Sequence, residues 1–124
     1  MLDHVSLGTH DLDRAVAFYT AVLAPFGYAL QRCDDNEAAF GTATDWVFFL
    51  YPLTPTDHAP GARTHVAFRA ASRADVHSAN AAALALGAQT IREPAARPEF
   101  GADYFGAVLR DADGHVIEVM TRAA

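Results

Sequence analysis

The sequence has little of several features that would point to particular protein classes. Its 124 residues include one cysteine, Cys33, which excludes an internal disulfide and is typical of a reducing compartment. No apolar run approaches the ~20 residues that a membrane-spanning helix needs. The N-terminus lacks the basic and apolar stretches of a signal peptide. We therefore expect a cytoplasmic protein with no membrane partner.

Positive charge is also scarce. Nine basic residues stand against fifteen acidic ones, which gives a net charge of −6. This balance argues against nucleic acid as a partner, because nucleic acid selects a basic surface. No glycine-rich phosphate loop and no Ser-His-Asp pattern is apparent. With 52% hydrophobic and 19% charged residues, the composition is that of one globular domain with a sizeable core.

What the chain does contain is a pattern that occurs twice. Residues 4–8 (HVSLG) and 65–69 (HVAFR) each open a β-prone stretch with a histidine. The first histidine lies 23 positions before Gly27, and the second lies 22 positions before Gly87. In both halves a helical pattern occupies the interval. Such self-similarity indicates an internal duplication, which makes positions in the two halves equivalent.

Each half is predicted to contain one strand, one helix and three further strands. The first helix follows a possible N-cap at Asp11 and stops at Pro25, and the second, over residues 73–86, follows a capping box that opens at Ser72. The predicted strands are 3–8, 28–33, 38–41, 46–51, 65–69, 89–93, 104–110 and 115–121. We therefore predict an α+β fold of two paired βαβββ modules, with curved mixed sheets forming an incomplete barrel and the helices outside. The first module spans residues 1–52, a proline-rich linker 53–63, and the second module 64–124.

Glu118 is the residue that most needs an explanation. It lies between Ile117 and Val119 in a β-prone run, and a carboxylate on a mostly buried strand needs a partner, a proton or a cation. Side-chain alternation places His4, His65 and Glu118 on the sheet faces away from the helices. Two imidazoles and one carboxylate suit a divalent transition metal such as iron, manganese, nickel or zinc. Three protein ligands would leave positions open for a small-molecule substrate.

Structural roles are the alternative for each of these residues. A histidine at the start of a strand often bonds to the backbone, and a strand glutamate can pair with an arginine. The equivalent positions of the two histidines in the repeat favour the metal site. The other histidines have no matching partners and are predicted to lie at the surface: His10, His58, His77 and His115.

Further candidates for substrate contact lie on or near the same faces. They are Ser6, Phe49, Tyr51, Ala67, Arg69 and Tyr104. The small residues would leave room for a substrate, and the aromatic ones would make one wall apolar. Arg69 is suited to an anionic group, and Tyr104 to a hydrogen bond with a substrate oxygen or to acid catalysis. Core filling for the aromatic residues and a solvated strand end for Arg69 are the plain alternatives.

The opening HVSLGTHDLDRAVAFYTAVLAPFGY and the closing YFGAVLRDADGHVIEV resemble the vicinal oxygen chelate superfamily, which includes glyoxalase I, extradiol dioxygenases, methylmalonyl-CoA epimerase, and fosfomycin and bleomycin resistance proteins. The resemblance covers essentially the whole chain. It implies metal ligands on the first and last strands of the modules, which map onto His4, His65 and Glu118. It also implies a homodimer, because many relatives pair their modules between subunits.

One position departs from this resemblance. Members similar to glyoxalase I take a fourth ligand, usually glutamate, from the last strand of the first module. Phe49 stands near that position here. The departure counts against glyoxalase I and the epimerase. It leaves a set of two histidines and one carboxylate, as in extradiol dioxygenases.

The residues and the resemblance together predict a glyoxalase- or dioxygenase-like metal-dependent enzyme. It would act on a small substrate with vicinal oxygens, as a lyase, an isomerase or a ring-cleaving dioxygenase, with Glu118 and Tyr104 in catalytic roles. The alternative is a metal-free protein of the bleomycin resistance type that sequesters a small molecule. A metal-free scaffold or regulatory subunit is a third reading. A sequestering protein needs no His-His-Glu set, so the metal content discriminates.

Overall fold

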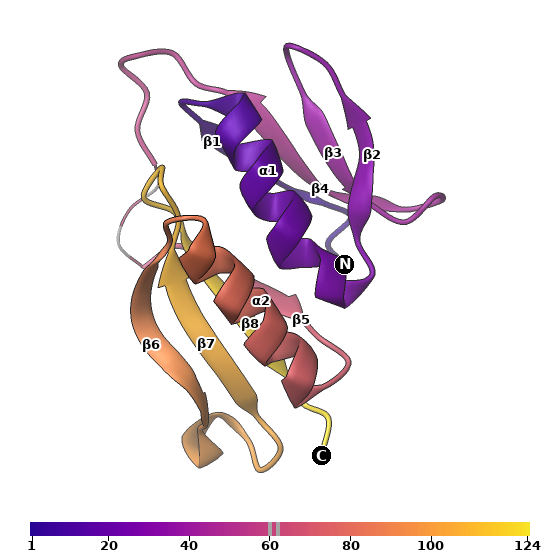
Figure 1. Cartoon of the computed structure of the whole chain (residues 1–124), viewed down its shortest axis with the longest axis vertical. Helices are drawn as coiled ribbons and strands as arrows, with labels where there is room; N and C mark the ends of the chain where they lie inside the picture. Colours follow the sequence, from indigo (N-terminus) through magenta and orange to yellow (C-terminus); the bar gives the residue numbers. More distant parts are fainter. Residues whose placement is uncertain (60, 62) are drawn as a thin grey trace.

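Two modules of the same plan make up the structure, a computed structural model that describes residues 1–59, 61 and 63–124. The first module contains β1 (Val5–Thr9), α1 (Leu12–Leu23), the 3-10 helix η1 (Ala24–Phe26), β2 (Ala29–Cys33), β3 (Ala38–Gly41) and β4 (Trp46–Pro52). The second contains β5 (His65–Arg69), α2 (Arg73–Ala85), β6 (Gln89–Ala96), the 3-10 helix η2 (Pro98–Phe100), β7 (Phe105–Arg110) and β8 (Val116–Thr121). Figure 1 shows the two modules and their adjacent helices. None of the described helices is long and apolar enough to cross a bilayer.

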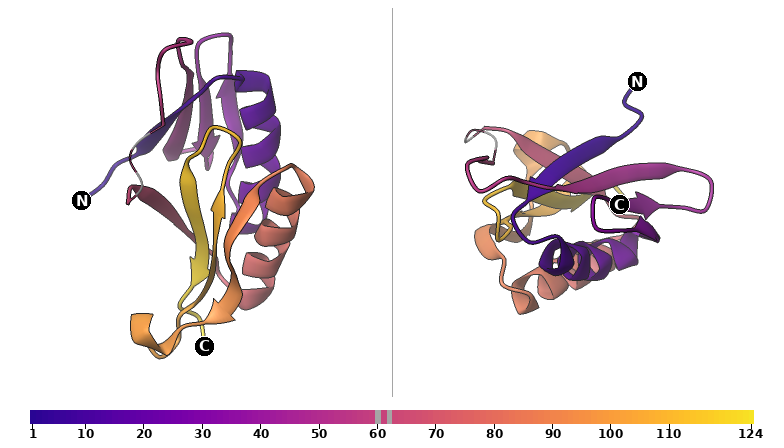
Figure 2. Two further views of the ribbon diagram at one scale, coloured as in Figure 1. Left: turned by 90° about the vertical axis from the view of Figure 1, so that its left-hand side faces the viewer. Right: turned by 90° about the horizontal axis from the view of Figure 1, so that it is seen from above.

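The two sheets have the same strand order. The first sheet runs β1-β4-β3-β2 and the second runs β5-β8-β7-β6. In each, the first strand pairs in parallel with the last, and the remaining pairs are antiparallel. The two four-stranded mixed sheets do not close into a barrel, and both helices lie on one side of them (Figure 2). The predicted α+β fold of two βαβββ modules is therefore confirmed.

Local sequence signals account for the start of both helices. The Asp11 carboxylate accepts a hydrogen bond from the Arg14 backbone N–H at 3.0 Å, and the Ser72 hydroxyl accepts one from the Asp75 N–H at 3.1 Å. These bonds satisfy backbone donors that have no partner inside the helix. Gly27, with φ +77°, then ends the first helical segment in the left-handed conformation that glycine tolerates.

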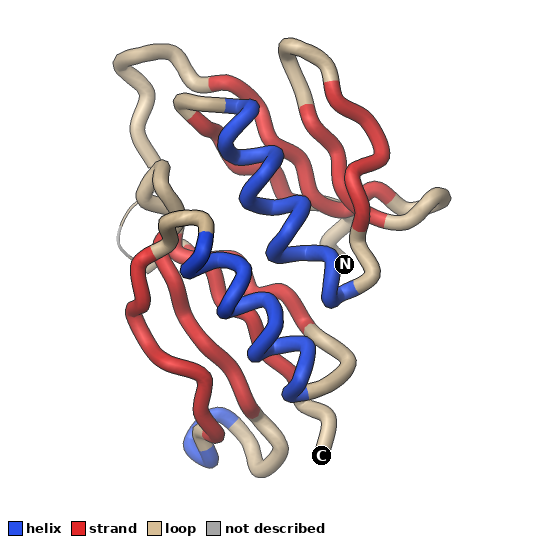
Figure 3. The backbone as a smooth tube through the Cα atoms, viewed as in Figure 1, coloured by secondary structure: helices blue, strands red, loops and turns tan. Residues whose placement is uncertain are grey.

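Strand β6 is longer than predicted. It extends to Ala96, although the sequence places Pro94 inside it and proline cannot donate to a sheet. The pairing of β6 with β7 is irregular between Arg92 and Ala95, and this irregularity accommodates the proline. The two 3-10 helices were not predicted either. Figure 3 shows η2 directly after β6.

One hydrophobic core is shared by the two modules. Phe48 of β4 packs against Tyr19 of α1, with ring centroids 4.8 Å apart, and against Phe68 of β5 at 5.3 Å. Ile117 and Val119 of β8 are fully buried in the same core. The opposite faces of the sheets carry exposed residues such as Ser6 and Ala67. The helices thus cover one face of each sheet, and the candidate residues lie on the other.

Candidate functional site

Glu118 lies at the centre of the candidate site. It projects from β8 on the side opposite to its buried neighbours in the core. One carboxylate oxygen, Oε1, accepts a hydrogen bond of 2.5 Å from the Tyr104 hydroxyl. The other, Oε2, lies 3.4 Å from Nε2 of His65 at the start of β5. Ala67 pairs with Glu118 in the parallel register, so a small side chain stands beside the carboxylate, whose side chain is 15% exposed.

Tyr104 is fixed in place by tight packing. Its side chain is 5% exposed, and a Cβ at Gly106 would lie 2.5 Å from the Tyr104 hydroxyl and 2.8 Å from the Cβ of Met120. Only glycine therefore lets the tyrosine ring lie across β7. Burial, followed by the hydrogen bond to Glu118, raises the pKa of Tyr104 to about 12. Near neutral pH the phenol therefore keeps its proton and donates a hydrogen bond to the Glu118 carboxylate.

These residues line a broad cavity. His65, Tyr104 and Glu118 all contribute to a cavity of about 750 Å³ on the second sheet. Phe100 and Val108 add apolar wall, and four arginines that the sequence analysis missed complete the lining: Arg63, Arg92, Arg110 and Arg122. A concave site with apolar walls and a few convergent polar groups is the usual form of a small-molecule site.

The candidates of the first module form a separate group on the first sheet. The exposed His4 precedes β1, and its ring meets that of Phe49 edge-on with centroids 5.1 Å apart. Its Nδ1 lies 2.6 Å from the Asp3 carboxylate. Ser6 pairs with Phe49 in the register of β1 and β4, and Phe49 stacks on Tyr51 with centroids 6.3 Å apart. None of these residues is among the described lining of the cavity.

The number of potential ligands in one place is therefore limited. Within residues 1–59, 61 and 63–124, no group of three or more histidine, cysteine, aspartate or glutamate side chains could hold a metal ion. The structure brings His65 and Glu118 together, and His4 lies with Phe49 instead. Arg69 is exposed at the end of β5 and is not part of the described cavity wall. The metal-ligand and substrate-contact roles of these residues stay predictions.

The prediction that His115 lies at the surface is wrong. Its side chain is 6% exposed, and its Nε2 lies 2.7 Å from the carbonyl oxygen of Gly8 in β1. The turn between β7 and β8 folds back onto the first module, which buries the ring and supplies its partner. Position at a strand end gave no indication of this contact, because it joins segments that are 107 residues apart.

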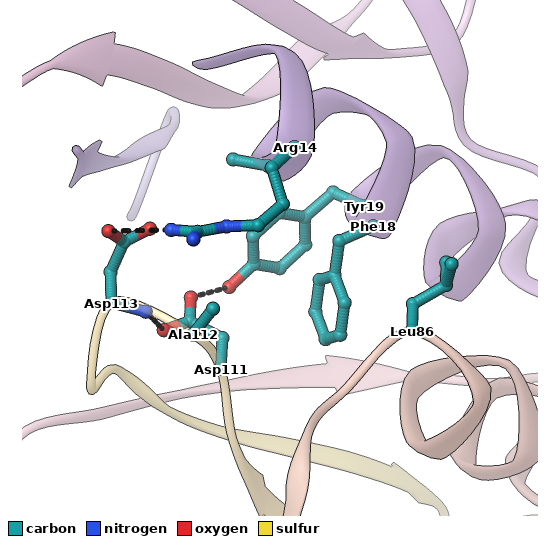
Figure 4. A pocket seen from close by; sticks show the side chains of 8 residues that line it. Arg14, Phe18, Tyr19, Leu86, Asp111, Ala112 and Asp113 are labelled. Atoms are coloured by element: carbon teal, nitrogen blue, oxygen red, sulfur yellow. Dashed lines mark hydrogen bonds and ion pairs between the residues drawn. The ribbon is translucent and has the colours of Figure 1, made fainter. Parts of the chain in front are cut away.

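The same turn makes a second buried contact with the first module. The Tyr19 hydroxyl in α1 donates a 2.6 Å hydrogen bond to Asp111, and Arg14 lies 3.5 Å from Asp113 (Figure 4). Burial and the neighbouring Asp111 carboxylate raise the pKa of Tyr19 well above its ordinary value. The space beside these residues measures about 10 Å³, roughly one water molecule. This region is therefore a contact between the modules and has no room for a ligand.

Comparisons with known proteins agree with this architecture. Residues 1–119 match the family model described as "Glyoxalase/Bleomycin resistance protein/Dioxygenase superfamily". A glyoxalase/bleomycin resistance protein from Albidiferax ferrireducens T118 is similar with a TM-score of 0.84 and 25% identity, over 98% of each chain. The fosfomycin resistance protein FosX from Listeria monocytogenes has a TM-score of 0.70 and 21% identity, over 98% of this chain and 92% of its own. TioX from Micromonospora sp. ML1 has a TM-score of 0.66 and 22% identity, over 98% and 95%. No curated protein matches the sequence.

Proposed function

Because the chain belongs to the Glyoxalase/Bleomycin resistance protein/Dioxygenase superfamily, we propose that it is a metal-dependent enzyme acting on a small substrate with vicinal oxygens. The reaction would be that of a lyase, an isomerase or a ring-cleaving dioxygenase. The observation that carries the proposal is the environment of Glu118. Its carboxylate lies between a histidine and a buried phenol in a cavity large enough for a small molecule.

The residues present fit part of a metal site. Nε2 of His65 and Oε2 of Glu118 lie 3.4 Å apart, a separation at which both atoms can bind one ion. Two ligands are too few for a stable site, so a third must come from elsewhere. We assign it to His4 of a second copy in a homodimer, in which the first sheet of one chain faces the second sheet of the other. His4 is exposed and at the edge of its sheet, as this arrangement requires.

The chain's own residues have distinct roles in this proposal. A bound divalent ion supplies Lewis acidity toward vicinal oxygens of the substrate. His65 and Glu118 would hold that ion. Tyr104 keeps its proton and fixes one oxygen of the Glu118 carboxylate, which leaves the other oxygen directed at His65. Phe100 and Val108 would contribute apolar surface to the wall beside the substrate.

The first test is metal binding by calorimetry. Metal-free protein is titrated with manganese, nickel, zinc and ferrous iron, and we expect one ion per chain for at least one of these metals. Loss of an outer partner alone weakens metal binding about 10–100-fold, so Glu118→Gln, which removes a ligand, should weaken it more than about 100-fold. His58→Ala, at an exposed histidine, is the control and should change the affinity less than about twofold. Unchanged binding by Glu118→Gln would exclude the proposed site.

Mixing two variants tests whether the site spans two chains. His4→Ala and Glu118→Gln each lack one ligand, but a mixed dimer contains one complete site. Equal mixing with free exchange of subunits should restore about a quarter of the wild-type metal sites, because half of the dimers are mixed and each has one of its two sites intact. No recovery, together with full binding by His4→Ala alone, would show that His4 is not a ligand.

Substrate panels then separate the reaction types. Catechols test ring cleavage, and the hemithioacetal of methylglyoxal and glutathione tests the glyoxalase reaction. We expect no activity on the hemithioacetal, because Phe49 occupies the position at which a fourth ligand would stand. If the wild type takes up none of the four metals but binds small molecules in the cavity, the sequestering function replaces the enzymatic one.

A further inference from the structure

Arginines are concentrated in the cavity of a chain that is acidic as a whole. All nine basic residues of the protein are arginines, and its net charge is −6. Four of the nine line the cavity on the second sheet: Arg63, Arg92, Arg110 and Arg122. Glu118 is the only carboxylate among the described residues of that lining. The cavity is therefore a positive region on a negative protein, which attracts anions.

Two of these guanidinium groups lie over aromatic rings, and all four lack a carboxylate partner among the described residues. The guanidinium of Arg92 lies over the Phe100 ring at 5.7 Å, and that of Arg122 lies over the Tyr104 ring at 5.6 Å. Arg122 also donates to the carbonyl oxygen of Phe100 at 2.9 Å. In the described part of the chain, none of the four arginines of the cavity pairs with a carboxylate within 4.0 Å.

Of the five arginines outside the cavity, two pair with a carboxylate, while Arg69, Arg73 and Arg97 have no carboxylate within 4.0 Å among the described residues. Arg14 lies 3.5 Å from Asp113, and Arg32 lies 3.5 Å from Asp34. Aromatic stacking orients a planar guanidinium and leaves its N–H groups available, which suits two-point recognition of an oxyanion. The cavity arginines therefore have the environment of anion-binding groups.

We propose that this cavity takes an anionic substrate, whose phosphate, phosphonate or carboxylate group binds Arg92 and its neighbours while its other oxygens face Glu118. The reaction at Glu118 rests on the proposed function above, but binding of the anion does not. Arg122 lies over the Tyr104 ring, whose hydroxyl binds Glu118, and Arg92 lies over the Phe100 ring, which packs against Tyr104 with centroids 5.3 Å apart. An oxyanion bound there would lie next to the carboxylate at which the reaction is proposed.

The surface of a second copy is the competing occupant for these arginines. Residues 1–52 carry two arginines and seven carboxylates, so the first module of another chain could also satisfy the positive charge. Arg122 lies over Tyr104, which binds Glu118, so its positive charge stands at the proposed reaction centre. This position favours a substrate anion over a carboxylate of a second copy. A charged small molecule would bind in the cavity in the first case, and loss of the arginines would dissociate a dimer in the second.

Two pairs of probes differ by a single anionic group and share vicinal oxygens. Dihydroxyacetone is compared with its phosphate, and catechol is compared with 3,4-dihydroxybenzoate, each by calorimetry on the metal-free and the metal-loaded wild-type protein. At least one charged probe should bind about tenfold or more tightly than its neutral counterpart, since hydrogen bonds to charged groups are the stronger class. Equal binding within both pairs would overturn the proposal.

Variants then assign the effect to the cavity. Arg92→Gln should abolish most of the preference for the charged probe, and Arg110→Gln serves as a second variant in case the first one unfolds. The matched control is Arg73→Gln. Arg73 belongs to helix α2, its guanidinium lies 5.0 Å from the centre of the Phe105 ring, and it is not among the described cavity lining. The control should keep the preference within about twofold. A preference retained by both cavity variants would overturn the assignment to these arginines.

Metal binding and sedimentation distinguish this proposal from the proposed metal-dependent reaction and from a subunit contact. If Arg92→Gln binds metal like the wild type but loses the preference for the anion, the inference is supported independently of the metal site. If the wild type prefers the charged probe but binds no metal, the inference stands and the proposed reaction fails. If sedimentation shows that Arg92→Gln dissociates a dimer while the preference is unchanged, the arginines serve a subunit contact and the inference is wrong.

Discussion

The two sheets of this protein have one topology and two different surfaces. Ser6 pairs with Phe49 in the first sheet, and Ala67 pairs with Glu118 at the equivalent position of the second. Phe49 stacks on an aromatic neighbour, whereas Glu118 accepts a hydrogen bond from a phenol and faces a histidine. The duplication therefore sets the position, and the residue at that position decides whether the sheet presents an aromatic ring or a carboxylate there.

The turns that precede the last strand of each module also differ in their surroundings. Asp111, in the turn between β7 and β8, is buried and accepts hydrogen bonds from Tyr19 and from two backbone N–H groups. Asp45, in the turn between β3 and β4, is exposed and makes only local contacts. The turn of the second module thus joins the two modules, whereas the turn of the first module lies at the surface.

The largest expected effect tests this difference between the turns. Asp111→Ala removes the acceptor of the Tyr19 hydroxyl and of the N–H groups of Asp113 and His115. Buried donors without a partner cost about 1–3 kcal/mol each before relaxation, so we expect the free energy of unfolding to fall by about 3 kcal/mol. Asp45→Ala should lower it by less than about 1 kcal/mol. Urea denaturation of both variants measures this, and equal losses would contradict the comparison.

The next effect concerns the packing that holds Tyr104. Gly106→Ala places a methyl group 2.5 Å from the Tyr104 hydroxyl and 2.8 Å from Met120, so the ring must move. Overpacking of this kind costs about 1–3 kcal/mol. We also expect the pKa of Tyr104 to fall from about 12 toward its ordinary value, because the ring loses burial and its bond to Glu118. Gly61→Ala, with nothing within 4 Å of its added Cβ, is the control in the same denaturation and spectrophotometric titrations.

Of the three expected losses in the free energy of unfolding, that of Tyr104→Phe is the smallest, and it depends on pH. The folded-state pKa of Tyr104 is raised to about 12, above the ordinary value of 10, so the protonated phenol stabilises the fold below pH ~10. Tyr104→Phe should remove about 1 kcal/mol at pH 8, the usual net value of one hydrogen bond. The difference from the wild type should shrink as the pH rises from about 10 to about 12. A difference independent of pH would show that the phenol is not the group involved.

The first sheet supplies the comparison for this phenol. Tyr51 is 40% exposed on the open face of the first sheet, so Tyr51→Phe should change the free energy of unfolding by less than about 0.5 kcal/mol at pH 8. Parallel denaturation curves for the two variants measure the contrast. A larger effect at Tyr51 than at Tyr104 would show that burial does not separate the two sheets.

Local patterns were sufficient to predict the fold. Asp11 and Ser72 cap the helices as their residue types indicate, and the alternation around Glu118 places Ile117 and Val119 in the core. The register of the sheets also agrees with the alignment of the repeat, because Phe49 in the first sheet and Glu118 in the second occupy equivalent positions. These features depend on residues that are close in the chain or on one pair of strands. The periodicity of apolar residues is therefore enough to predict them.

Contacts between distant segments were not predictable in this way. His115 is buried because a turn of the second module meets Gly8 of the first, and no periodicity encodes that approach. The lining arginines were missed because they come from separate segments, and irregular pairing around Arg92 breaks the alternation that would have revealed its side. His4 lies with Phe49 because the two residues belong to the same sheet, His4 directly before β1 and Phe49 in β4, which pairs with β1.

Side chains along β7 and β8 alternate between the hydrophobic core and the cavity. Leu109 and Ile117 pair with each other inside the core, while Val108 and Glu118, one position away, pair with each other at the cavity. If the cavity binds the proposed substrate, substitutions at the second pair would alter which molecule is accepted, while the first pair stays buried in the core. Under the proposed function, a change of ligand preference at Val108 would therefore leave the core contacts of Leu109 and Ile117 in place.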